Sequence, residues 1–167
     1  MTRARAVALA AVAIGFAGLA AWRGLPWGDE REIRATLESL AEGFNASTSD
    51  GLGTLARAAQ LGSYFSDNVI VDLGPGSAAI EGRERLIGMA ARLQPRTAAY
   101  RVVLDDISVE TPGAQGTADV TLTVSFIRRD PATDEESTDA REFALQMIKG
   151  GGRWRIERAT AIDTFRK

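Results

Sequence analysis

The chain has 167 residues, which is room for one domain, and a formal net charge of −2 with 25% charged side chains. It contains no Cys and no His, so disulfides, zinc–thiolate sites, thiol nucleophiles and acid–base devices built on His are excluded. The charge balance excludes a general nucleic-acid surface, and we find no cluster of Asp and Glu typical of a metal site. We therefore expect no cofactor, no metal and no nucleic acid.

An apolar segment opens the chain. Residues 6–22 carry no charge, and Arg3, Arg5 and Arg23 flank them. As a helix this segment would span about 25 Å, slightly less than the hydrocarbon core of a membrane. It fits a signal anchor or a cleaved signal peptide; we favour the anchor, because Trp22 and Arg23 are typical of a membrane interface.

The positive charges before the apolar segment predict that the rest of the chain lies outside the cytoplasm. We expect a bacterial inner-membrane protein facing the periplasm or the outside, or a periplasmic or secreted protein if the signal is cleaved. The expected boundaries are 1–23 for the anchor or signal peptide, 24–28 for a Pro/Gly linker and 29–167 for the domain.

Three helices are predicted at the start of this domain. The first begins at Asp29, which forms a capping-box pair with Glu32. Its apolar face consists of Ile33, Leu37, Leu40 and Phe44. A second helix begins near Asp50, and a third covers about 83–93 and stops before Pro95.

From residue 100 the apolar pattern changes to a period of two, which is typical of strands. An interruption at Asp105 and Asp106 predicts a β-bulge. Residues 117–126 alternate, with one face made of Ala118, Val120, Leu122, Val124 and Phe126 and the other rich in Thr. The last strand is expected to present one common face: Trp154, Ile156, Arg158, Thr160 and Ile162. Helices followed by long strands predict an α+β fold, with helices on one face of a curved antiparallel sheet.

The stretch VIVDLGPGSAAIEGRERLIG (69–88) does not have the glycine spacing of a phosphate-binding loop, so its glycines are better explained as a corner of the fold. The longer stretch YFSDNVIVDLGPGSAAIEGRERLI (64–87), together with the closing GGRWRIERATAID (151–163), resembles the NTF2-like superfamily, which includes SnoaL-type cyclases and ketosteroid isomerase. The resemblance covers residues 29–167. It implies an α+β cone of three N-terminal helices on a curved antiparallel sheet, a scaffold that hosts enzymes, binders and assembly modules alike.

The resemblance also excludes one activity. The catalytic Asp of the isomerase branch falls on Leu73, and its phenolic donor falls near Leu40. Leucines supply neither a base nor an oxyanion donor, so isomerase activity of that kind is not expected.

Five residues remain as candidates for a site. Asp72 is a candidate catalytic base if it points inward, although capping of the corner amides is the favoured interpretation. Arg158 is expected to point into the cone, where it would bind a ligand carboxylate or, as we favour, pair with an internal acid. Arg141 lies two residues before the inward Phe143, so it is expected to share that face and to lie at the pocket rim. Tyr64 and Trp154 are candidate pocket residues.

Two functions stay open. The favoured one is a non-enzymatic module that binds a small apolar or acidic ligand or a protein partner, anchored through residues 6–22. Its Thr-rich face at 117–125 suits a homodimer, although an ordinary solvent-exposed face explains the same pattern. The alternative is a SnoaL-type isomerase, cyclase or hydrolase that uses Asp72 as base and Arg158 to orient the substrate.

Overall fold

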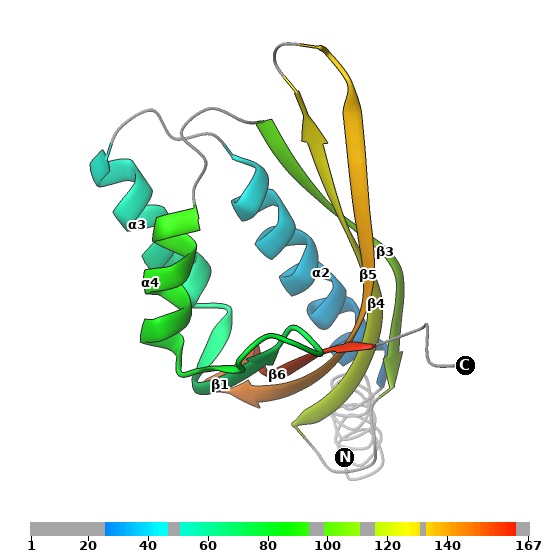
Figure 1. Ribbon diagram of the computed structural model, residues 1–167. Helices are drawn as coiled ribbons and strands as arrows, with labels where there is room; N and C mark the ends of the chain where they lie inside the picture. Colours follow the sequence, from blue (N-terminus) through cyan, green and yellow to red (C-terminus); the bar gives the residue numbers. More distant parts are fainter. Residues whose placement is uncertain (1–25, 47–50, 94–98, 111–115, 131–132, 163–167) are drawn as a thin grey trace, which may run out of the picture.

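Three helices lie on the concave side of a curved sheet in the computed structural model, which describes residues 26–46, 51–93, 99–110, 116–130 and 133–162 (Figure 1). The helices are α2 (Pro26–Asn45), α3 (Gly51–Gly62) and α4 (Arg83–Leu93). The strands are β1 (Phe65–Asp72), β2 (Ile80–Glu81), β3 (Ala99–Glu110), β4 (Thr117–Arg129), β5 (Glu136–Gly150) and β6 (Arg153–Ile162). The predicted α+β class and the third helix are confirmed.

The sheet is mixed, not antiparallel throughout as expected. Its strand order is β2-β1-β6-β5-β4-β3, and β1 runs parallel to β6 while the other neighbours are antiparallel. The reason is topological: β1 and β6 lie at opposite ends of the domain sequence, so no tight turn forces them to run in opposite directions. The two-residue strand β2 then follows the Gly-Pro-Gly corner and pairs with β1.

Helix α2 begins at Pro26, not at Asp29 as predicted. Proline suits the first position of a helix because an amide hydrogen at that position would have no acceptor within the helix. The expected capping pair is wrong as well: the carboxylates of Asp29 and Glu32 both bind Lys149 Nζ, each at 2.7 Å.

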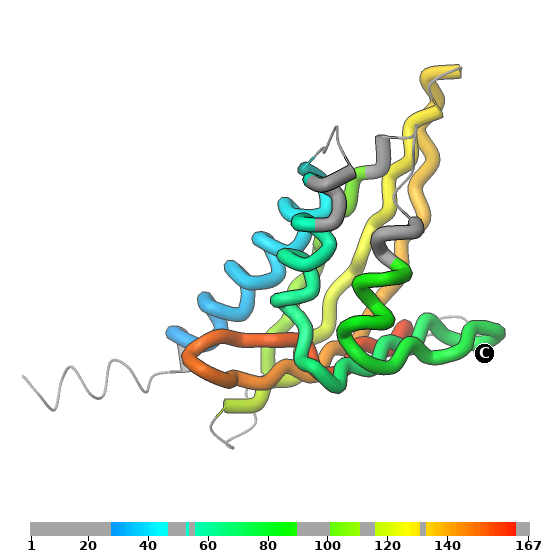
Figure 2. The backbone as a smooth tube through the Cα atoms, turned by 90° about the vertical axis from the view of Figure 1, so that its left-hand side faces the viewer, coloured from blue at the N-terminus to red at the C-terminus, as the bar shows by residue number. Residues whose placement is uncertain are grey.

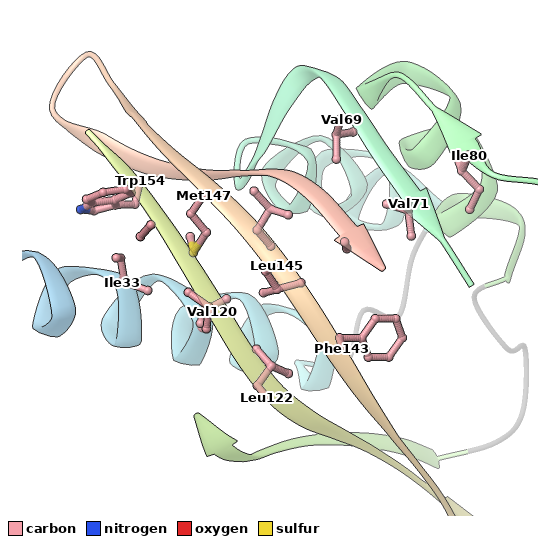
Figure 3. Close-up of a cluster of buried hydrophobic side chains, with 14 residues drawn as sticks. Ile33, Val69, Val71, Ile80, Val120, Leu122, Phe143, Leu145, Met147 and Trp154 are labelled. Atoms are coloured by element: carbon pink, nitrogen blue, oxygen red, sulfur yellow. The ribbon is translucent and has the colours of Figure 1, made fainter. Parts of the chain in front are cut away.

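The core fills the space between α2 and the concave face of the sheet, as Figure 3 shows. Ile33 and Leu37 of α2 are buried, as their helical spacing predicts. The strands contribute alternate residues, among them Val120, Leu122, Leu145, Met147 and Trp154. Leu40 is only partly buried and Phe44 is 48% exposed, so the apolar stripe of α2 leaves the core towards the C-terminal end of the helix.

The bulges are the main irregularities of the sheet. The predicted one lies between Asp105 and Ser108 in β3, where Asp106 has a φ of 53°. A second, which the sequence analysis did not anticipate, lies in β6: Gln146 pairs with Arg158 while Met147 pairs with Ile156. Glu157 is therefore an extra residue that no partner opposes.

This second bulge reverses the faces of β6 beyond Ile156. Trp154 and Ile156 are buried as predicted, but the next inward residue is Ala159, and Arg158 is exposed on the convex face. The expectation that Arg158, Thr160 and Ile162 share the inward face with Trp154 is therefore wrong, because strict alternation holds only along an uninterrupted strand.

In the part of the chain that the structure describes, no helix is long and apolar enough to span a membrane. The predicted anchor or signal peptide at 1–23 lies outside the described residues, as does the beginning of the predicted linker.

Candidate functional site

The Gly-Pro-Gly corner holds Asp72 in a capping role. The Gly74 amide donates a hydrogen bond of 2.9 Å to Asp72 Oδ1, and Gly74 has a φ of 93°. Such a bond from an Asp side chain to the amide two residues later is an Asx turn. In register, Asp72 lies beside Thr160 on the convex face, whereas Val71 points into the core. The favoured sequence interpretation, a cap and not an inward base, agrees with this placement.

Arg158 lies in a groove on the convex face of the sheet, with a volume of about 440 Å³. Two neighbouring cross-strand rows form the groove. The first row consists of small side chains: Ser108, Thr121, Ala144 and Thr160. The second row is polar and charged: Glu110, Asp119, Gln146 and Arg158.

The charges of this second row are separated along its length. Glu110 and Asp119 stand on β3 and β4 at one end, and Arg158 stands on β6 at the other. None of the three forms an ion pair with another described residue. The internal acidic partner favoured for Arg158 is therefore not found among the described residues, and the row carries unused charge of both signs.

Tyr64 and Trp154 come together elsewhere, at the end of the sheet where β5 turns into β6 beside the start of α2 (Figure 2). They line a hollow of about 400 Å³ between α2, the α3–β1 corner and the start of β6. Its polar wall residues are Glu32, Thr36, Ser63 and Arg153. Tyr64 is held in place because its carbonyl oxygen accepts a hydrogen bond of 2.9 Å from the Ile156 amide.

Trp154 has an unusual polar environment. The side chain is buried, and its Nε1 has no hydrogen-bond partner among the described residues. Lys149 Nζ lies 5.6 Å from the centre of the ring and is held there by Asp29 and Glu32. These hydrogen bonds raise the pKa of Lys149 above its ordinary value of 10.5. A positive charge is thus fixed over the aromatic face, an arrangement that the ring quadrupole favours.

Arg141 lies at the other, wide end of the concave face. It is paired with Val124 and shares the face of Phe143, as its parity predicts. Its side chain is 53% exposed and lies 3.6 Å from that of Asp139. Phe126, next along this face of β4, is 39% exposed. The predicted face of Arg141 agrees with the strand register, but Arg141 lines neither the groove of Arg158 nor the Tyr64–Trp154 hollow, so its place at a pocket rim stays a prediction.

Sequence reasoning missed the residues that surround these candidates. Thr36, Ser63 and Arg153 join Tyr64 and Trp154 only because three separate elements meet. Gln146 and Glu110 join Arg158 through strand register, which no local pattern encodes. The one available signal was the period-two pattern of β4, which already put Asp119 and Thr121 on one face.

No group of three or more Asp and Glu residues that could hold a metal ion occurs among the residues with described placement. Three helices on a curved mixed sheet, with an apolar concave face, define the class as an NTF2-like α+β cone. Within that class the chain belongs to the SnoaL-like domain family, which its residues 29–160 match.

Solved structures agree with this fold. An NTF2-like protein with a cystatin-like fold from Novosphingobium aromaticivorans superposes with a TM-score of 0.65 at 18% identity, over 87% of this chain and 89% of that chain. A protein assigned as a scytalone dehydratase from the same species has a TM-score of 0.64 at 14% identity, over 81% and 83%. A protein assigned as a calcium/calmodulin-dependent protein kinase II association domain from Xanthomonas campestris has a TM-score of 0.60 at 13% identity, over 80% and 88%.

At these identities the similarity establishes the fold alone. No curated protein matches the sequence. The specific function must therefore be argued from the residues of this chain.

Proposed function

We propose that the protein is a non-enzymatic assembly module, whose convex sheet face binds a second copy of the chain. The observation that carries this proposal is the row Glu110–Asp119–Gln146–Arg158, with acids at one end, a cation at the other and no described ion-pair partner for any of the three charges. Beside it runs a row of small side chains that allows another sheet to approach closely.

Symmetry makes the charge pattern self-complementary. In a two-fold dimer, if residue i of one copy contacts residue j of the other, then j also contacts i. When the axis lies between the two sheets and runs along the strands, the strand order of the second copy is reversed. Arg158 of each copy then faces Glu110 and Asp119 of the other. An axis across the strands would instead place Arg158 opposite Arg158, which like-charge repulsion opposes.

The centre of the same face suits an interface core. Charged residues are depleted at the cores of protein interfaces. On β4 the central convex positions are Thr121, Thr123 and Ser125, and these face Ala144, Glu142 and Ala140 of β5. Only Glu142 carries a charge in this block.

The structural neighbours do not decide between the two roles. The neighbour assigned as a kinase association domain is consistent with an assembly role for the fold, and the neighbour assigned as a dehydratase is consistent with an enzymatic role. The proposal is therefore based on the convex face of this chain.

Sedimentation of the full-length protein in detergent micelles tests the proposal. We expect a dimer for the natural chain, and we expect Arg158→Glu alone and the double variant Glu110→Lys/Asp119→Lys alone to be monomeric. Mixing the two variants should restore a heterodimer, because the swapped charges complement each other across the interface. A monomeric natural chain would overturn the assembly role. A fully dimeric Arg158→Glu variant would overturn the convex face as its site.

We also propose that residues 6–22 anchor the domain outside the cytoplasmic membrane, which rests on the uncharged segment and the arginines before it. Alkaline phosphatase fused after Lys167 is active only outside the cytoplasm. An active fusion supports the location, and an inactive, stably expressed fusion contradicts it.

The enzymatic alternative lacks support from the geometry. It needs Asp72 as a base at the apolar interior and Arg158 beside it. Asp72 Oδ1 instead accepts the Gly74 amide, and both residues stand on the convex face. Among the residues that the structure describes, no placement favours this second function over assembly.

A further inference from the structure

We infer that the hollow beside Trp154 is a binding site for a small carboxylic acid with an apolar body. This inference is independent of the proposed assembly role, because the hollow lies at the β5–β6 end of the domain and shares no lining residue with the convex groove. Its volume of about 400 Å³ lies within the range of small-molecule sites.

The unpaired indole nitrogen is the first argument. Figure 3 shows that Nε1 lies at the end of the Trp154 ring that points away from Met147 and the rest of the labelled core. A buried N–H without an acceptor costs about 1–3 kcal/mol, and buried Trp side chains ordinarily find a partner for this group. A ligand that brings an acceptor atom to Nε1 would recover this cost.

The other wall groups define which ligand fits. The Thr36 hydroxyl donates to the Glu32 carbonyl oxygen and the Ser63 hydroxyl donates to the Gln60 carbonyl oxygen, both at 2.7 Å. Their protons are already used. The groups left to donate are Trp154 Nε1, the Tyr64 phenol and the Arg153 guanidinium at the rim. A ligand with acceptor atoms is therefore favoured over one with donors.

An unpaired cation at the rim favours an anionic acceptor. Lys149 Nζ binds both Glu32 and Asp29, so this ammonium group offsets one of the two carboxylate charges. Arg153 is exposed and forms no ion pair with another described residue, so its charge is available to a carboxylate. Trp154, Tyr64 and Ala35 provide the apolar part of the wall for the body of the ligand.

The nitrogen becomes accessible only when a wall side chain moves, and we propose Glu32 for that role. Nε1 itself is shielded from solvent, so an acceptor reaches it only after a neighbour turns aside. The Glu32 side chain is 55% exposed and is held through its carboxylate by Lys149. Because Lys149 keeps its bond to Asp29, Glu32 can turn outward without leaving the ammonium group unpaired.

Nuclear magnetic resonance of the indole N–H groups tests the inference. The chain has three tryptophans, and Trp22→Phe/Trp27→Phe leaves Trp154 as the only indole. We expect sodium benzoate to move the Trp154 Nε1–H resonance downfield and to saturate, whereas benzylamine, of similar shape but with a donor in place of the carboxylate, should leave it unchanged. Full-length protein in detergent micelles is used throughout.

Two further variants complete the test. Arg153→Gln should weaken benzoate binding by roughly tenfold, the size of one charge-assisted hydrogen bond. Arg85→Gln, which removes an exposed charge from α4, should not change it. A benzoate shift that never saturates, an equal response to benzylamine, or equal weakening in both Arg variants would each overturn the site.

Discussion

The two faces of the same sheet differ in what their side chains must do. On the concave face, residues such as Leu122 pack against the helices and are almost completely buried. On the convex face the neighbouring residue, Thr123, belongs to a surface of small and polar side chains that no described helix covers (Figure 1). The strand backbone is common to both faces, so their different roles come from alternate residues alone. Four changes test this comparison, in order of decreasing expected effect.

The largest contrast is expected between adjacent residues of β4. Leu122→Ala should lower the free energy of unfolding by about 2–5 kcal/mol, because it removes buried methyl groups and leaves a cavity. Thr123→Ala changes the convex face only and should stay within about 0.5 kcal/mol of the natural chain. Urea unfolding of both variants measures the difference, and equal losses would refute the assignment of the two faces.

The bulge of β6 is the next point to test. Deletion of Glu157 removes the extra residue and makes Arg158 follow Ile156 directly, so Arg158 keeps its place opposite Gln146 on the convex face and Ala159 stays inward. Only the bulge and the local twist that it gives the strand are lost, so we expect a loss of about 2 kcal/mol. Glu157→Ala keeps the extra residue and is the matched control, with an expected change near zero. A loss of more than about 4 kcal/mol in the deletion variant would contradict this account, because it would mean that Arg158 had been forced into the core.

A smaller effect is expected where α2 ends on the sheet edge. The Asn45 side chain donates to the Val102 carbonyl oxygen at 2.8 Å and accepts from the Val102 amide at 2.7 Å. Asn45→Ala removes both hydrogen bonds at an exposed position and should cost about 1–2 kcal/mol. Asn45→Asp keeps an acceptor but no donor, so thermal unfolding should place it between Ala and the natural residue.

The smallest effect is expected for Lys149, which pairs with two acids of α2. Lys149→Gln should cost about 1 kcal/mol or less, because the ion pairs with Asp29 and Glu32 are partly exposed. Folding raises the pKa of Lys149 above its ordinary 10.5, so the stabilisation is complete below that pH and is lost as the pH rises through the raised folded-state pKa. The stability gap between the two proteins should therefore close in strong base. If the stability difference persists in strong base, Lys149 stabilises the fold by packing on Trp154 and not by its charge.

Local patterns predicted the parts of the fold that depend on local rules. The helical spacing of Ile33 and Leu37, the alternation of β4 and the bulge near Asp106 are all present. The parallel pairing of β1 with β6 was not predictable, because it joins segments that are distant in sequence.

The site was less predictable than the fold for a specific reason. One inserted residue, Glu157, inverts everything after it in β6, and nothing in the sequence RWRIERATAI marks it. The hollow around Trp154 needs three elements to meet, whereas the capping role of Asp72 is local and was anticipated.

The bonds from Asn45 to Val102 have a consequence for the behaviour of the protein in concentrated solution. Strand β3 is the last in the sheet order, and its outer backbone groups would otherwise be free to accept a strand from another molecule. At Val102 both of these groups are already occupied by the final residue of α2, and further along, the bulge after Asp105 interrupts the straight edge. The last residue of one helix thus obstructs the fibrous, edge-to-edge growth to which an open sheet is exposed.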